Sequence, residues 1–190
     1  MRKLTLKGFL AQYVKKLSKS DTLDMKKLAD EASSGNVRLR APLVLYTVAT
    51  GKETLLLTCL QELGDSSDMA DDLARFSGND MEAMLENGNV PDEYLKVWNS
   101  YLVARDAPAR DEALKAEMRK KVLRLQQEAD CSNYRIYTDL NLNPGNINSW
   151  LKNGDSAKVS YRTAERVMDY VLASARSEYS AQAAEPKRHM

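Results

Sequence analysis

Residues 141–154 read NLNPGNINSWLKNG and predict a tight turn followed by a short helix. Asn141 tolerates the positive φ angle that a turn between two steeply crossed helices requires. Asn143 is a strong N-cap residue, and Pro144 suits the first helical position, where its missing N–H would be unpaired anyway. We therefore expect a helix to begin at Asn143 and Pro144, with Leu142 under the corner.

This predicted helix has two distinct faces. Ile147, Trp150 and Leu151 recur at helical spacings and should pack inward against Ile136 and Leu140 of the preceding helix. The opposite face is small and polar, contains no Asp or Glu and ends in a lysine: Gly145, Asn146, Ser149 and Lys152, with Asn148 at the flank. A solvated helix face usually mixes both signs of charge, whereas a surface that meets DNA avoids acids.

Three further helices are predicted around this segment. A long helix should run from Pro108 to about Ala129, with an apolar seam of Leu114, Met118, Val122, Leu125 and Ala129. The seam spans too few heptads to indicate a coiled coil, and packing against the following helices is the favoured use. Ser132 can cap the helix NYRIYTDL at residues 133–140. Residues 158–173 then predict an amphipathic helix with Ala164, Val167, Met168, Val171 and Leu172 inward.

In order and spacing, residues 115–175 resemble the lambda-repressor-like helix-turn-helix domains of bacterial and phage regulators. The resemblance implies a five-helix bundle whose third helix enters the major groove of DNA. It places the base-reading positions on Asn143, Pro144, Gly145, Asn146 and Ser149. It also implies a phosphate contact from Asn133, where the family often has Gln, and a homodimer on a palindromic site.

Three features depart from the family pattern. Tyr137 stands where Ala is usual and the two helices cross, Asn141 replaces a common glycine, and the loop after Trp150 is one residue longer. The pattern would also suit a helical bundle whose Asn-rich corner is simply a well-capped turn. The side chains favour DNA binding over a purely structural turn, because Asn can pair with N6 and N7 of adenine and Lys152 can contact phosphate.

The first 106 residues predict an all-helical domain of their own. Helices are expected over LTLKGFLAQYVKKL, over TLDMKKLADEA with Asp21 as cap, over KETLLLTCLQEL, over residues 66–76 and 79–87, and over DEYLKVWNSYLVA. APLVLYTVAT predicts a buried helix with Pro42 near its start, although its length also permits a strand. Ala107-Pro108-Ala109 interrupts the pattern. We therefore predict an all-α protein with domains at 1–106 and 107–178 and a tail at 179–190.

Charge is balanced overall but unevenly distributed. The 190 residues carry a formal net charge of +1. Residues 61–95 hold ten acids against Arg75 alone, whereas residues 115–176 hold eleven Lys or Arg against seven acids. Phosphate is attracted to the second segment and repelled by the first. The acids Asp65, Asp68, Asp71 and Asp72 lack an EF-hand pattern and are interpreted as a solvated helix face.

The residue inventory argues against an enzyme, and no cofactor or metal is expected. His189 is the only histidine in the sequence, which removes histidine-based triads and zinc sites. Cys59 and Cys131 have no CxxC partner, and neither GxGxxG nor a P-loop occurs. No membrane span or secretory signal is predicted, so a cytoplasmic location is expected.

The predicted function is sequence-specific binding of double-stranded DNA by a transcriptional regulator of bacterial, phage or mobile-element origin. The open alternative is a protein-interaction module, antitoxin-like or inhibitor-like, that binds a protein partner through its helical domains. Direct DNA binding predicts salt-sensitive association with duplexes, whereas a pure interaction module predicts none at ordinary ionic strength.

Overall fold

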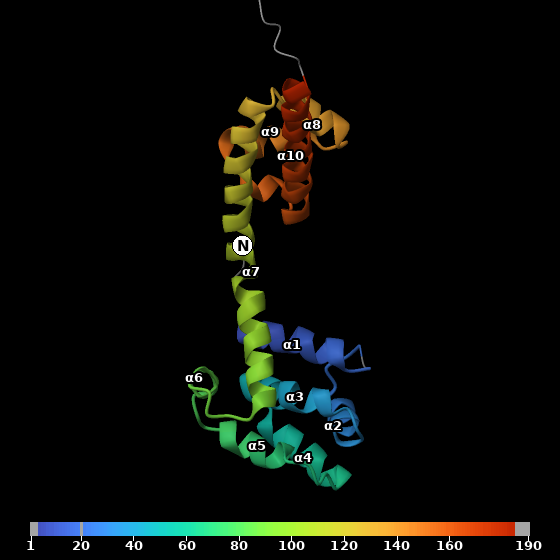
Figure 1. Ribbon diagram of the computed structural model, residues 1–190. Helices are drawn as coiled ribbons and strands as arrows, with labels where there is room; N and C mark the ends of the chain where they lie inside the picture. The colour runs from blue at the N-terminus through green and yellow to red at the C-terminus, as the bar shows by residue number, and fades with distance from the viewer. Residues whose placement is uncertain (1–3, 20, 185–190) are drawn as a thin grey trace, which may run out of the picture. The chain divides into compact units, whose positions relative to one another are not determined.

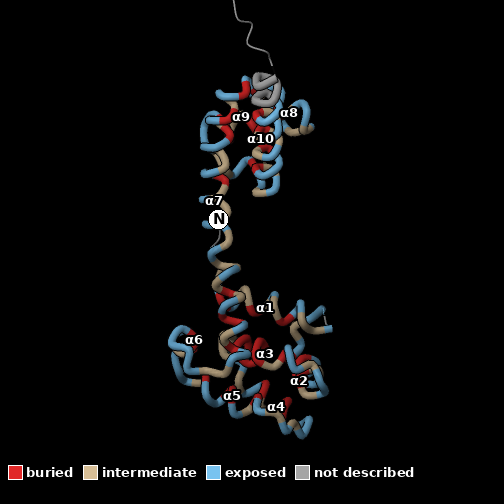
Figure 2. Tube along the Cα trace, viewed as in Figure 1, coloured by how far each residue is buried: buried red, intermediate tan, exposed pale blue. Residues whose placement is uncertain are grey.

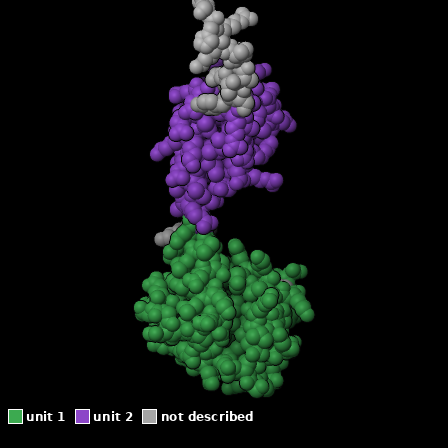
Figure 3. All heavy atoms as spheres, in the orientation of Figure 1, with its two compact units in different colours: residues 1–106 green, residues 107–190 purple. Residues whose placement is uncertain are grey.

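The computed structural model describes residues 4–19 and 21–184. The chain divides into two compact units, residues 1–106 and 107–190, which Figure 3 distinguishes by colour. Every regular element in the described ranges is helical, without a strand, as the sequence predicts. None of the described helices is both long enough and apolar enough to cross a membrane. Each unit has its own group of buried residues (Figure 2).

Unit 1 is assembled around one apolar helix. Its elements are α1 (Leu6–Leu17), α2 (Met25–Ser33), α3 (Val37–Thr50), α4 (Glu53–Leu63), α5 (Met69–Phe76), α6 (Met81–Glu86) and the first part of α7 (Asp92–Glu128) (Figure 1). The run Leu43, Val44 and Leu45 is fully buried. A helix that is apolar on all sides must be covered on all sides. Accordingly, α1, α2 and α5 pack around α3.

The start of unit 1 differs from the sequence prediction at two helix boundaries. The cap of α2 is Asp24, not Asp21: its Oδ1 accepts a 3.2 Å hydrogen bond from the backbone N–H of Lys27. This later start places Met25 in the core at 5% exposed. Helix α3 begins at Val37, so Pro42 lies inside the helix rather than near its start. The strand alternative for this segment is wrong.

Helix α7 also corrects the sequence prediction, because it continues through Pro108 as one helix of 37 residues. A proline inside a helix costs about 3 kcal/mol, since it removes one hydrogen bond and crowds the preceding turn. The flanking sequence VARDAPARDEALKAEM is rich in Ala, Arg and Glu, which are strong helix formers. Their combined preference carries the helix past a residue that was expected to end it.

Unit 2 consists of the second part of α7, α8 (Asn133–Asp139), α9 (Pro144–Asn153), the 3₁₀ turn η1 (Ser156–Lys158) and α10 (Tyr161–Ala184). Its described part therefore contains four α-helices and η1, where the family resemblance implies five helices. Ala164, Val167 and Val171 of α10 are fully buried, as expected. The predicted tail from residue 179 is helical up to Ala184, and its remainder, with His189, lies outside the described residues.

Candidate nucleic-acid interface

The turn between α8 and α9 is built by the local rules that the sequence indicates. Ser132 caps α8 by accepting a 3.3 Å hydrogen bond from the N–H of Arg135. Asn141 has φ +50°, the left-handed conformation that the turn requires. Asn143 Oδ1 accepts a 3.1 Å bond from the N–H of Asn146, and Pro144 follows as the first helical residue. The predicted start of α9 is thus confirmed.

The inner face of α9 confirms the predicted register. Ile147, Trp150 and Leu151 are at most 1% exposed. They join the core of unit 2 together with Ile136 of α8, and Leu140 and Leu142 pack against the same cluster. Because these three residues fix the rotation of α9 about its axis, they also determine which side chains face solvent.

The outer face of α9 begins with exposed residues at Asn143, Pro144, Gly145 and Asn146, and Lys152 is exposed near its end. Gly145 has a local reason to lack a side chain. A Cβ at this position would lie 3.2 Å from Asn143 Oδ1, the atom that caps the helix. Glycine therefore keeps the cap undisturbed, in addition to leaving the backbone of the first turn accessible.

Ser149 has a neighbour that helical spacing did not indicate. It is half-buried, and its hydroxyl donates a 3.4 Å hydrogen bond to Asp155 Oδ2 in the loop after α9. An acidic side chain therefore stands at the C-terminal end of this face, although α9 itself contains none. The exposed polar residues of this face are therefore those of its first turn and Lys152.

Asn133 and Asn148 are joined to each other and to α7. Asn133 Nδ2 donates a 3.0 Å hydrogen bond to Asn148 Oδ1. Gln126 Nε2 donates to Asn133 Oδ1 and to the backbone carbonyl of Cys131, both at 2.8 Å. All three amide side chains are half-buried. The structure thus brings together two residues predicted as separate DNA contacts and adds Gln126, which sequence reasoning missed.

Two basic residues of α7 hold the far end of α9 and the loop that follows. Arg119 Nε donates to the carbonyls of Trp150 at 2.8 Å and Leu151 at 3.1 Å, and its Nη2 donates to Lys152 O at 3.2 Å. Lys115 is 6% exposed, and its Nζ donates to Ser156 O at 2.8 Å and Val159 O at 3.2 Å.

These supporting residues have a signal in the sequence. Lys115, Arg119, Val122 and Gln126 follow each other at spacings of four, three and four, so the three polar residues share a stripe of α7 with Val122 of the apolar seam. Polar residues on such a stripe are candidates for hydrogen bonds to packed neighbours. Glu112 adds to the support, since hydrogen bonds from Lys115 and Ser156 lower the pKa of its carboxyl.

Two tyrosines lie on α8, and the end of α8 is hydrogen-bonded to α10. Tyr134 is 66% exposed and meets Tyr137 edge-on, with ring centroids 5.5 Å apart. Tyr137 is half-buried and packs against the core at the position where the resembled family has Ala. Tyr170 of α10 donates a hydrogen bond to Asp139 Oδ2, and Arg166 Nη2 donates to Leu140 O at 3.1 Å. Helix α8 is therefore anchored at its end by α10.

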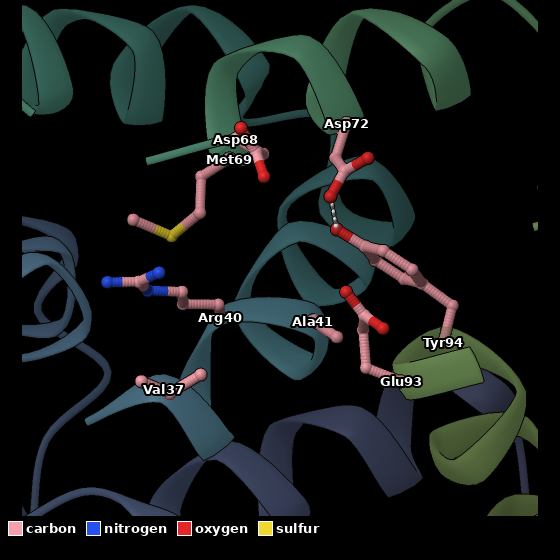
Figure 4. A pocket seen from close by; sticks show the side chains of 8 residues that line it. All are labelled: Val37, Arg40, Ala41, Asp68, Met69, Asp72, Glu93 and Tyr94. Atoms are coloured by element: carbon pink, nitrogen blue, oxygen red, sulfur yellow. Dashed lines mark hydrogen bonds between the residues drawn. The ribbon is translucent and has the colours of Figure 1, made fainter. Parts of the chain in front are cut away.

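Unit 1 contains a separate cavity of about 250 Å³ between α3, α5 and the start of α7. Figure 4 shows Arg40 on one side of the cavity and Asp72, Tyr94 and Glu93 on the other, with Asp68 and Met69 above Arg40 in this view. Tyr94 Oη donates a 2.6 Å hydrogen bond to Asp72 Oδ2. Burial, followed by this hydrogen bond, raises the pKa of Tyr94 far above its ordinary value.

The position of Asp72 at this cavity differs from the expectation that the acids of this segment form a solvated helix face. Asp72 is 8% exposed and does not lie on a solvated face, whereas Asp68 and Asp71 are exposed. Its second oxygen, Oδ1, lies 3.5 Å from Nη1 of Arg75. Within the described ranges no three His, Cys, Asp or Glu side chains are grouped so as to hold a metal ion.

Comparison of the chain with protein-family models, with curated proteins and with solved structures finds no significant match.

Proposed function

We propose that this chain binds double-stranded DNA sequence-specifically and regulates transcription in a bacterium, phage or mobile element, with α8 and α9 as a lambda-repressor-like helix-turn-helix. The observation that carries the proposal is that the two sides of α9 differ in polarity and burial. Its apolar side is fully buried, while its polar first turn and Lys152 are exposed and the helix carries no acid. A recognition helix needs this arrangement, because it must present hydrogen-bonding groups to base edges without repelling phosphate.

The contacts divide into two kinds. Asn146 lies in the first turn of α9, and the amide side chain there can bond to base edges in the major groove. Lys152 supplies positive charge for phosphate. Asn133, the first residue of α8, is the second phosphate contact that the resemblance implies. The Asn143 Oδ1 atom and the Ser149 hydroxyl each form one hydrogen bond within unit 2. Each side chain can form further hydrogen bonds, which are available to DNA.

The direct test is a fluorescence-anisotropy titration of the full chain with duplex DNA from upstream of its own gene and with a scrambled duplex. We expect tighter binding to the upstream duplex, and affinities for both duplexes that fall steeply as salt rises. Sedimentation of the protein with a two-half-site duplex tests the homodimer implied by the resemblance. Absence of salt-dependent duplex binding would overturn the proposal.

A second candidate function is binding of a protein partner through unit 1, and the mixed-charge cavity favours it. Of the three carboxylates that line the cavity, Asp72 already contacts Tyr94 and Arg75. Asp68 and Glu93 suit a cationic side chain with an apolar stem, which Val37 and Met69 would contact. Titration of a labelled Lys-rich peptide onto the chain and onto its Glu93→Gln variant tests this candidate. If both proteins bind the peptide equally, or if neither binds it, this second candidate function is excluded.

A further inference from the structure

The hydroxyl of Ser149 is hydrogen-bonded to a carboxylate at the C-terminal end of α9. Gly154, at φ +77°, ends the helix and turns the chain back. The backbone N–H of Asp155 then donates a 3.3 Å hydrogen bond to Ser149 O, and Ser149 Oγ donates a 3.4 Å hydrogen bond to Asp155 Oδ2. Two bonds therefore hold the carboxylate beside the hydroxyl. Both residues are half-buried, so part of each remains accessible to a ligand.

The number of hydrogens decides what this pair offers to a ligand. A serine hydroxyl has one hydrogen and two lone pairs, and an ionised carboxylate has lone pairs only. The hydrogen between Ser149 and Asp155 is therefore that of the hydroxyl. No other side chain in the described part of the chain donates to Asp155. While this bond is kept, the hydroxyl has no second hydrogen to give, and the pair offers acceptors alone.

A pair that offers only acceptors distinguishes base edges in the major groove. Adenine has a donor at N6 and cytosine has one at N4, whereas guanine presents acceptors at O6 and N7 and thymine presents one at O4. Ser149 Oγ can accept from either amino group and keep its bond to Asp155. To bond guanine or thymine, the hydroxyl must turn its hydrogen away from Asp155, which leaves a charged acceptor without its donor. Each base pair has one amino group in the major groove, so the preference decides which strand carries it.

We propose that Asp155 is a positioning residue that holds the hydrogen of the Ser149 hydroxyl, so that Ser149 selects adenine or cytosine over guanine or thymine at one position of the contacted strand. This inference rests on the proposed DNA binding, with Ser149 among the base-reading residues, and adds the class of base that it selects. Asp155 lies in the loop after α9 and acts on the base only through Ser149. Its negative charge weakens the attraction to phosphate equally for every sequence, so base preference and overall affinity can be measured separately.

The test measures the affinity of the full chain for four duplexes that differ at a single base pair. Selection from a randomised pool by the unchanged protein, by Ser149→Ala and by Asp155→Asn identifies that pair. The unchanged protein should bind duplexes with adenine or cytosine there roughly twofold to tenfold more tightly than those with guanine or thymine, the range for one net hydrogen bond. Asp155→Asn should bring this ratio toward one, because an amide N–H can donate to Ser149 Oγ and release the hydroxyl hydrogen.

Glu165→Gln is the matched control for the lost charge. Glu165 is exposed on α10 of the same unit, so this variant also removes one negative charge, and it should retain the preference. Ser149→Ala should lose the preference, and adding Asp155→Asn to Ser149→Ala should change the ratio no further. If Asp155→Asn does not fold by circular dichroism, the DNA supplies the test. Purine in place of adenine lacks the N6 amino group, and it should weaken binding by the unchanged protein more than binding by Ser149→Ala.

The possible failures are distinguishable. Salt-dependent binding with guanine or thymine preferred, with all four duplexes bound equally, or with the preference retained in Asp155→Asn overturns the role of the Ser149–Asp155 pair alone. A preference that survives Ser149→Ala but is lost in Asp155→Asn would mean that the carboxylate contacts the base itself, which also overturns the positioning role. Absence of salt-dependent duplex binding by the unchanged protein overturns the proposed function and this inference together.

Discussion

Nε of Arg119, on α7, lies 2.8 Å from the carbonyl oxygen of Trp150, in the last turn of α9. The last carbonyls of a helix have no partner within the helix, and together they carry the negative end of its dipole. Arg119 satisfies three of them at once, since it also reaches Leu151 and Lys152. One guanidinium therefore fixes the C-terminal end of α9, while Asn143 caps the other end.

Removal of this contact should destabilise unit 2. Arg119→Ala deletes a charged donor from three carbonyls and should cost about 1.5–3 kcal/mol, the range for hydrogen bonds to charged groups. Arg119→Lys should recover only part, because an ammonium cannot span three acceptors in the same way. Urea unfolding followed by Trp150 fluorescence, in a Trp98→Phe background, reports on unit 2. Arg124→Ala is the control: Arg124 is 74% exposed in its ion pair and should cost less than about 0.5 kcal/mol.

Trp150 should tolerate Phe far better than Ala. Trp150→Ala opens a large cavity in the core and should cost about 3–5 kcal/mol. Trp150 Nε1, however, is buried without a hydrogen-bond partner among the described residues. Trp150→Phe removes this unsatisfied donor, which offsets much of the lost packing. The free energy of unfolding of Trp150→Phe should therefore lie within about 1 kcal/mol of that of the unsubstituted protein. Hydrogen exchange of peptides from α8 and α10 measures both changes, and equal losses would contradict the role assigned to the donor.

The Tyr94–Asp72 pair predicts a loss of stability of unit 1 at high pH. Burial and the hydrogen bond raise the pKa of Tyr94 in the folded chain, whereas in the unfolded chain the phenol titrates near its ordinary value of about 10. The stabilisation is therefore complete below about pH 10 and is lost as pH rises further, because only the unfolded state releases the proton easily.

Tyr94→Phe removes this contribution. At pH 8 the variant should be about 1–3 kcal/mol less stable, because a buried carboxylate loses its donor. Between pH 10 and 11 the difference between the two proteins should narrow. Urea midpoints from Trp98 fluorescence, in a Trp150→Phe background, measure both. A gap that stays constant with pH would show that Tyr94 ionises equally in the folded and unfolded chain.

Local signals in the sequence were sufficient for the turn and for the register of α9. Asn141, Asn143 and Pro144 each act within two or three residues of themselves, so their type alone determines their conformation. The burial of Trp150 follows equally directly from helical spacing. The turn and the register of α9 can be predicted because they follow from residues close together in the sequence, although the core that covers Trp150 includes residues of α7 and α10.

Features that depend on competing or distant interactions were missed. Pro108 signals a helix end by itself, but the helix formers on both sides outweigh it. Asp72 belongs to a run of acids, yet it is buried because Tyr94, far along the chain, donates to it. The partners of Asn133 lie on α7 and α9, and only the packing of three helices brings them together.

Asn146 and Lys152 should affect DNA binding in different ways. Both are exposed, so replacing either with Ala should leave the fold intact. Asn146→Ala should weaken specific binding by roughly 1–3 kcal/mol and relax preference at one base pair, as expected when a base-edge contact is lost. Lys152→Ala should weaken binding to specific and random duplexes alike and lower the salt slope by about one unit, as expected for one phosphate contact. Anisotropy titrations of both variants at several salt concentrations measure these quantities. If the two substitutions weaken specific and random duplexes equally, Asn146 does not read bases and the outer face of α9 contacts only the DNA backbone.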